Sequence, residues 1–136
     1  MYERAFKLEI ITPSKVVYRN EATSLGAPGV LGGFQILYDH APFLSALEIG
    51  TIKVKDATGN DTLFATSGGF IEVKDNHVVV LADTAERAEE IDVERAKSAK
   101  DRASSRLHSH DEHIDVLRAH VALLRAVNRL RIAERA

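Results

Sequence analysis

Six arginines in the C-terminal third of the chain have a spacing suited to anion binding. They form two trios with the same offsets of 0, +7 and +11 residues: Arg95, Arg102 and Arg106, then Arg118, Arg125 and Arg129. At about 3.6 residues per turn, each trio falls on one face of an α-helix. Guanidinium forks match the oxygens of phosphates and carboxylates. If the two faces meet, the pattern predicts a site for a polyphosphate or an acidic partner.

A second interpretation needs no ligand. The arginines could form two solvated helix faces, supported at i,i+4 spacing by Glu94, Asp101 and Asp115. Both interpretations remain open on the residues alone.

The histidines suggest a metal site only weakly. His108, His110 and His113 are closely spaced and His120 follows, but the chain has no cysteine. We therefore expect no metal.

Sequence signatures of catalysis are also missing. The glycines do not form a phosphate-binding loop, and Ser67-Gly68-Gly69 lacks the glycine that would precede a nucleophilic serine. We expect that the protein is not an enzyme.

Composition divides the chain into two parts. All eight glycines, all three prolines and all eight aromatic residues lie before residue 71. Residues 86–136 are rich in Ala, Arg, Leu and Glu, which favour helices. We predict a β-domain over residues 1–85 and a helical segment over 86–136. The net charge of −2 argues against general nucleic-acid binding. The chain has no run of 18 apolar residues, so we expect no membrane span.

Short alternating segments predict the strands of the first part. Phe6 to Ile10 alternates apolar and charged residues, and similar runs recur at spacings of about 8–12 residues between turn formers. Asp75-Asn76 signals a β-hairpin, and Gly68-Gly69 signals a close backbone approach at a strand start. The pattern predicts an all-β antiparallel sandwich or barrel.

The second part predicts an α-helical hairpin. Asp92 can cap a first helix, and His108 to Asp111 is the expected break. A second helix is expected over 113–135. Its two apolar lines are Leu117, Val121 and Leu124, and Val116, Leu123, Val127 and Leu130.

Several motifs resemble the epsilon subunit of F-type ATP synthase, of the bacterial, nucleotide-binding type. They are the stretches 67–73, 80–88 and 91–96, with His40-Ala41-Pro42 and Asn128-Arg129-Leu130, and they span nearly the whole chain in order. The resemblance implies a sandwich of about ten strands followed by a mobile two-helix hairpin.

The resemblance also implies a role in the rotor. The sandwich would bind the gamma subunit and sit on the c-subunit ring, coupling proton flow to ATP synthesis. The helical hairpin, when extended, would inhibit ATP hydrolysis and meet an acidic loop of the beta subunit through its basic residues. The complex would lie at the cytoplasmic face of the bacterial plasma membrane, with this subunit peripheral to it and without nucleic acid.

ATP is the regulatory ligand that the resemblance implies for the compact hairpin. Carried over residue by residue, the ATP contacts would be Glu86, Ile91, Asp92, Arg95, Ala96, Arg118, Arg125 and Arg129. Arg118 and Arg102 are weaker candidates than the others. One segment departs from the family: Gly33 replaces a Glu and Tyr38-Asp39 replaces a Pro-Gly turn, in a region that approaches the c ring.

Two alternatives belong to other classes of protein. One is a structural coupling subunit that binds no nucleotide. The other is a nucleic-acid-binding β-barrel with a basic helical arm, which the acidic β-domain disfavours, since residues 1–85 carry 7 basic and 10 acidic side chains.

Overall fold

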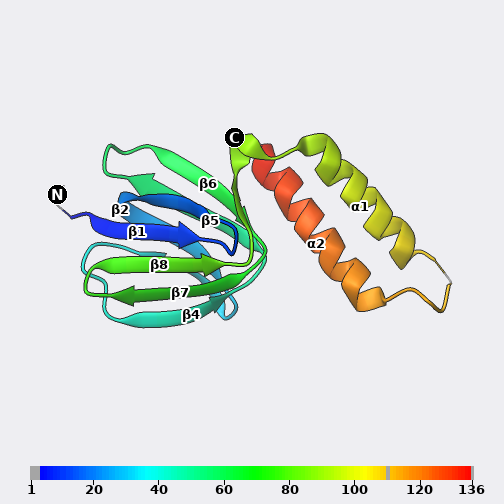
Figure 1. The fold of residues 1–136 in the computed structure, drawn as a ribbon, viewed down its shortest axis with the longest axis horizontal. Coiled ribbons are helices and arrows are strands. Elements are labelled where there is room, and N and C mark those ends of the chain that lie inside the picture. Colours follow the sequence, from blue (N-terminus) through cyan, green and yellow to red (C-terminus); the bar gives the residue numbers. More distant parts are fainter. Residues whose placement is uncertain (1–3, 110, 136) are drawn as a thin grey trace. The chain divides into compact units, whose positions relative to one another are not determined.

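The computed structural model describes residues 4–109 and 111–135, and the chain divides after Arg87 into two compact units (Figure 1). The first unit is built from strands and the second from helices. The predicted antiparallel sandwich followed by an α-helical hairpin is confirmed.

Nine strands form the first unit in the described part of the chain. They are β1 (Phe6–Ile11), β2 (Val16–Gly29), β3 (Gly32–Ile36), β4 (Phe43–Leu47), β5 (Gly50–Asp56), β6 (Asp61–Thr66), β7 (Gly69–Lys74), β8 (His77–Ala82) and β9 (Ala85–Arg87). The segments 16–18 and 22–27 both belong to the single long strand β2. A register shift between Ala22 and Ser24 lets β2 bend and pair with several neighbours.

The strand order explains how one sheet makes two layers. It runs β1-β8-β7-β4-β2-β5-β6-β9, with β3 beside β2 and a further pairing of β1 with β2. Every pairing is antiparallel except that of β1 with β8, which is parallel. Alternation along the strands sends one set of side chains inward, and Phe6, Leu8 and Ile10 are at most 1% exposed.

Two turn predictions are confirmed in detail. Asp75 and Asn76 join β7 to β8 with φ of 52° and 58°, the left-handed pair that a tight hairpin requires. Gly69 begins β7 with φ of 141°, and a Cβ there would lie 2.8 Å from the Cα of Ala82. A side chain at this position would therefore collide with the neighbouring strand.

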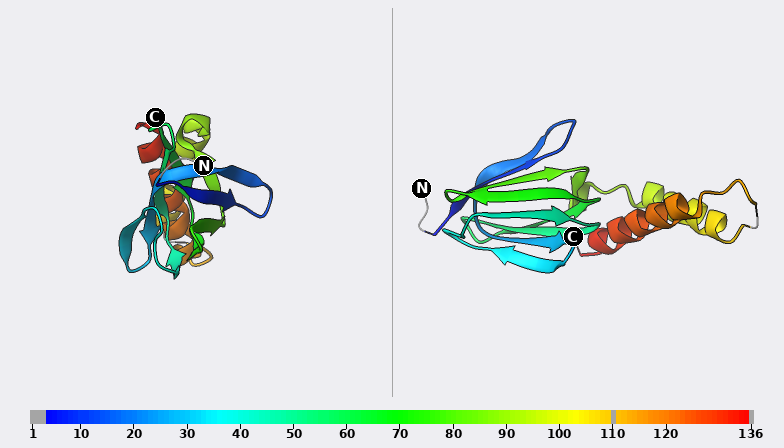
Figure 2. Two further views of the ribbon diagram at one scale, coloured as in Figure 1. Left: turned by 90° about the vertical axis from the view of Figure 1, so that its left-hand side faces the viewer. Right: turned by 90° about the horizontal axis from the view of Figure 1, so that it is seen from below.

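The helical unit contains a 3-10 turn η1 (Ala88–Glu90), α1 (Val93–Leu107) and α2 (Val116–Ala133). Figures 1 and 2 show the two helices side by side and antiparallel. Asp92 and Asp115 cap them, each accepting a hydrogen bond from the backbone N–H three residues on. Because Asp115 is the cap, α2 starts at Val116 and not at His113, and it ends two residues before Arg135.

The prediction for how α2 packs was partly wrong, although Val121, Leu123 and Leu130 are half-buried as expected. Leu117 and Val116, expected on the packing lines, are 73% and 63% exposed. The buried positions of α1 and α2 are Asn128, Ile132 and four alanines, which we call the seam: Ala96, Ala103, Ala119 and Ala126. Their small side chains let α1 and α2 approach closely, and the larger residues are left at the edges.

Candidate functional site

Each seam alanine directly follows an arginine in the sequence. The four dipeptides are Arg95-Ala96, Arg102-Ala103, Arg118-Ala119 and Arg125-Ala126. One residue corresponds to about 100° around a helix, so each arginine lies roughly a quarter turn from the seam, in the same sense. In two antiparallel helices, equal rotations from the shared seam point to the same side of the pair. The seam thus directs all four arginines to one side of the helical hairpin.

The remaining members of the trios, Arg106 and Arg129, extend the same side. We call this six-residue surface the arginine side. Because the helices are antiparallel, the arginine side has two levels, meaning two positions along the helix axes. Arg95 and Arg125 lie near one level, and Arg102 and Arg118 lie near the other. The levels are separated by about 10 Å, since seven residues advance about 1.5 Å each.

Most guanidinium groups on the arginine side have no carboxylate partner. Within residues 4–109 and 111–135, the side chains of Arg95, Arg102, Arg106, Arg118 and Arg125 form no ion pair, whereas Arg129 is engaged. The expected i,i+4 ion pairs of Glu94 and Asp115 with these arginines are not formed. The Asp115 carboxylate caps α2, and the Glu94 Oε1 atom lies 3.8 Å from Lys97 Nζ. The arrangement concentrates positive charge, which favours polyanions.

The other predicted ATP contacts have different environments. Asp92 is exposed at the N-terminus of α1, with its Oδ1 atom 3.1 Å from the Arg95 nitrogen that donates to it. Glu86 is half-buried in β9, where it pairs with Ala65. Ile91 and Ala96 are 8% and 0% exposed. The apolar members are thus buried, and the polar members keep accessible surface.

No metal site is formed by the described residues. His108 is used locally, with its Nδ1 atom 2.7 Å from the carbonyl oxygen of Ser104. His110, one of the histidines considered for metal binding, lies outside the described residues.

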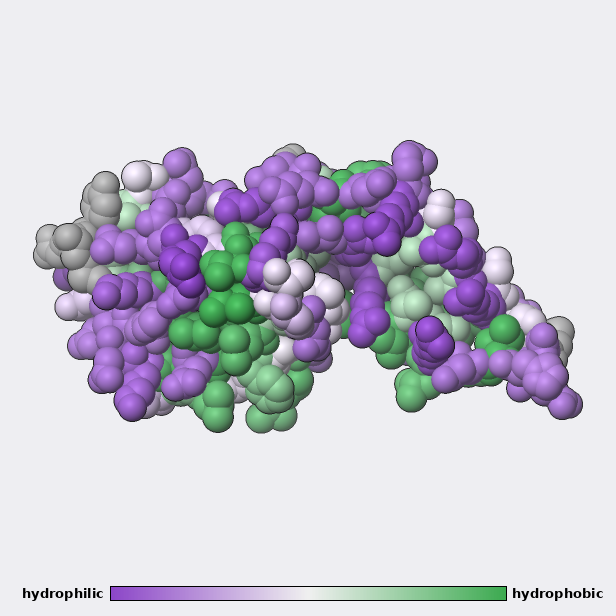
Figure 3. All heavy atoms as spheres, in the orientation of Figure 1, coloured by the Kyte–Doolittle hydropathy of each residue, from purple (hydrophilic) through white to green (hydrophobic). Residues whose placement is uncertain are grey.

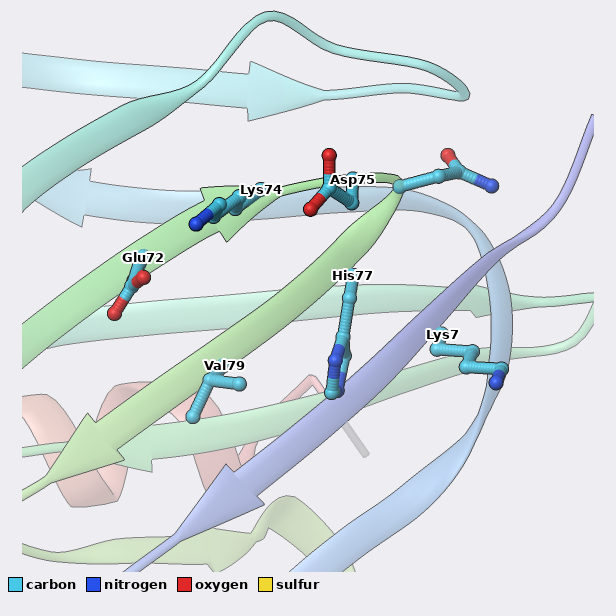
Figure 4. Close-up of a pocket in the computed structure, with 7 residues that line it drawn as sticks. Lys7, Glu72, Lys74, Asp75, His77 and Val79 are labelled. Carbon is cyan, nitrogen blue, oxygen red and sulfur yellow. The ribbon is translucent and has the colours of Figure 1, made fainter.

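A shallow depression of about 440 Å³ lies on the first unit, and none of the predicted site residues lines it (Figure 4). Its lining consists of Lys7, Glu72, Lys74, Asp75, Asn76, His77 and Val79. Beside it, Glu9 accepts hydrogen bonds from Arg19 and contacts His77 Nε2 at 2.9 Å. These hydrogen bonds, that of Arg19 first, hold the pKa of Glu9 below its ordinary range. The mixture of charges in the depression favours no particular ligand.

One face of the first unit is apolar at the surface. Leu44, Phe70 and Leu81 are 72%, 57% and 54% exposed on β4, β7 and β8. Phe70 pairs directly with Leu81, so these side chains adjoin on one face. Apolar atoms gather over these strands in Figure 3. A contiguous exposed patch of this kind indicates a surface that binds another protein.

Two structural features could not be predicted from the sequence. Arg87 stacks over the rings of Phe64 and Tyr18, with its guanidinium carbon 5.4 and 6.0 Å from their centroids. The Asn76 side chain bonds two segments far away in sequence. Both features join residues that are far apart in the sequence. The hairpin signal at Asp75-Asn76 indicated a turn at Asn76 but not its long-range hydrogen bonds.

Neither α1 nor α2, nor any other helix in the described ranges, has the length and apolar character to cross a lipid bilayer.

Comparisons with known proteins agree over the whole chain. Residues 5–88 match the model of the ATP synthase delta/epsilon chain β-sandwich domain, and residues 89–134 match that of the delta/epsilon chain long α-helix domain. An ATP synthase epsilon chain of Desulforamulus reducens is 52% identical over 94% of this chain and 96% of its own length. Another ATP synthase epsilon chain, from Syntrophomonas wolfei, is 47% identical over 99% of this chain and 98% of its own length.

Among solved structures, a chain of the Euglena gracilis mitochondrial ATP synthase has a similar fold. The TM-score is 0.78 at 22% identity, over 91% of this chain and 78% of that one. At this identity the likeness concerns the fold alone.

Proposed function

The chain belongs to the ATP synthase delta/epsilon chain family, and from this premise we propose that it is the epsilon subunit of a bacterial, proton-translocating ATP synthase. One observation carries the proposal: both domain models match in order, and relatives named epsilon chain align over nearly the full length of both chains. In this role the protein is a non-catalytic part of the central stalk, at the cytoplasmic face of the membrane.

The first unit supplies the contacts of the rotor. We assign the apolar face formed by Leu44, Phe70 and Leu81 to the gamma subunit, because burying these exposed side chains stabilises association. The segment Gly32–His40 is assigned to the c-subunit ring, as the family resemblance implies. Leu37 and Tyr38 are each 51% exposed there and offer apolar contacts.

The helical hairpin is the regulatory part, and ATP is its proposed ligand. Arg95 and Arg125 share one level of the arginine side, and Arg129 lies about one turn further along α2; near the N-terminus of α1 the helix dipole also favours an anion. Phosphate oxygens would bind these guanidinium groups, and Asp92 could accept hydrogen bonds from amino or hydroxyl groups. Arg118 would contribute from the next level.

An inhibitory role follows from the same charges. When the hairpin extends, its arginine side is available to an acidic loop of the beta subunit. ATP and this loop would compete for guanidinium groups, so ATP would favour the compact hairpin and relieve inhibition of hydrolysis.

The rotor assignment is tested by adding the full chain to an ATP synthase depleted of its epsilon subunit and inserted in vesicles. We expect restored proton-coupled ATP synthesis, and loss of that restoration when Phe70→Glu introduces a charge into the apolar face. A chain that neither binds the depleted complex nor restores synthesis would contradict the proposal.

A second candidate is a coupling subunit that binds no nucleotide. The burial of Ile91 and Ala96 favours it, since two of the eight expected contacts present almost no surface. ATP titration of Arg125→Ala separates the two. If Arg125 forms one charged hydrogen bond, its loss weakens binding by about 1.5–3 kcal/mol, roughly 10- to 150-fold.

A further inference from the structure

We propose that Asn76 is a positioning residue for the segment Gly32–His40, acting through Asp39 from a different β-hairpin. The inference rests on the proposed function, in which this segment contacts the c-subunit ring.

Asn76 connects three segments that are far apart in sequence. Its Oδ1 atom accepts a hydrogen bond from the backbone N–H of Asp39 at 2.8 Å, and its Nδ2 atom donates to the carbonyl of Ala5 at 2.9 Å. Its own carbonyl accepts from the N–H of Lys7 at 3.2 Å. One side chain thus ties the chain before β1 and the segment after β3 to the turn between β7 and β8.

The turn that carries Asn76 is itself well fixed. Asp75 and Asn76 both have positive φ, and Lys74 pairs with His77 across the hairpin. Figure 4 shows the β7–β8 hairpin with Lys74, Asp75 and His77 at this end of the two strands. The Asn76 amide is therefore presented from a rigid two-residue turn.

Asp39 requires such support because of its backbone conformation. Its φ of 56° lies in the left-handed region, which Asp tolerates better than most residues but still at a cost. Glycine adopts a positive φ freely, whereas Asp39 does so at a cost that a hydrogen bond can offset. The hydrogen bond from Asp39 to Asn76 stabilises this conformation without glycine.

The far side of the same loop is held by aromatic rings. His40 packs edge-on against Phe43 with ring centroids 5.6 Å apart, and Phe43 packs in the same way against Phe34 at 5.0 Å. Leu37 and Tyr38 are therefore displayed from a loop that is anchored on both sides. A pre-ordered loop loses less conformational entropy when its partner binds.

The experiment compares three full-length variants. Asn76→Gly keeps the positive φ of the turn and removes both side-chain hydrogen bonds. Asn76→Asp keeps an acceptor for the Asp39 N–H and removes the donor to Ala5. Asn60→Gly is the matched control, because the side-chain amide of Asn60, in the β5–β6 turn, bonds only the nearby Thr58.

Two quantities are measured for each variant. The first is hydrogen exchange of the Asp39 amide in the isolated chain. The second is affinity for an ATP synthase complex that contains the c-ring and lacks its epsilon subunit. We expect Asn76→Gly to speed Asp39 exchange about tenfold and to weaken binding by a similar factor, with Asn76→Asp and Asn60→Gly close to the parent chain.

The outcomes separate the inference from the proposed function. Unchanged Asp39 exchange in Asn76→Gly, or faster exchange with unchanged affinity, overturns the positioning role. If Asn76→Gly and Asn76→Asp speed Asp39 exchange and weaken binding to the same extent, Asn76 does not act through its hydrogen bond with Asp39. Failure of the parent chain to bind the complex overturns the proposed function instead, and leaves the exchange result as the test of the loop.

Discussion

Replacing a seam alanine by leucine should open the helical hairpin and leave the sandwich intact. Ala103 is 1% exposed, at a position where α1 and α2 are separated only by small side chains. A leucine there adds three carbon atoms at a buried position, so we expect the helices to move apart or the side chain to adopt a strained rotamer.

The expected magnitude follows from the chemistry of overpacking. Extra methylene groups in a packed interface cost about 1–3 kcal/mol, which corresponds to a change of about 5- to 150-fold in the equilibrium between closed and open helices. The helical unit has few large buried side chains, Ile91 and Ile132 among them, to compensate for such a loss. The core around Phe6 and Phe64 belongs to the other unit and should be unaffected.

Hydrogen exchange of the full-length chain measures both effects at once. In Ala103→Leu, amides within 93–107 and 116–133 should lose protection by the factor given above, while amides of β1 and β8 should not change. Ser105→Leu is the control, because it adds a leucine to an exposed position on the same helix. Equal protection in Ala103→Leu and in the parent chain would refute the claim that the seam holds the helices together.

Three further predictions concern the first unit. Gly69→Ala should destabilise the sandwich by more than about 2 kcal/mol in urea unfolding, because Gly69 has a φ of 141° and lies close to β8. Gly33→Ala is the control: the atom nearest to the added Cβ would lie 3.7 Å away, so we expect no such loss of stability. Glu9→Gln should flatten the acid limb of the stability–pH curve. The pKa of the Glu9 carboxyl is lower in the folded chain than in the unfolded chain. The ionised carboxylate therefore stabilises the fold at a pH above its pKa in the unfolded chain, and this stabilisation is lost as the pH falls through its pKa in the folded chain. An unchanged acid limb in Glu9→Gln would contradict this. Arg87→Leu should cost about 1–2 kcal/mol and increase exchange at Ala85–Arg87, with Arg87→Lys intermediate; equal stability of all three chains would exclude the stacking contribution.

The sequence was sufficient for the features that depend on local chemistry. Asp92 caps the first helix because Asp favours that position, and the helix-forming composition of residues 86–136 marks the helical part. The repeat of the arginine offsets indicated two faces. It did not reveal which residues bring these faces to one side, because that depends on alanines which carry little hydrophobic signal of their own.

The packing of α2 could not be read from hydrophobicity. Leu117 and Leu124 look like core residues, yet they are 73% and 46% exposed, since close helix contact selects small residues over large ones. The parallel pairing of β1 with β8 was equally invisible, because it joins segments about 70 residues apart. Asn76 was recognised as a turn residue, but its bonds to Ala5 and Asp39 depend on that same long-range pairing.

The central claim is that the arginine side closes around a polyanion such as ATP, and hydrogen exchange of the full chain with and without ATP tests it most directly. The account predicts that ATP increases protection of amides in 93–107 and 116–133, and that Arg95→Ala and Arg125→Ala abolish most of the increase. Equal protection with and without millimolar ATP, or an increase that survives both substitutions, would contradict it.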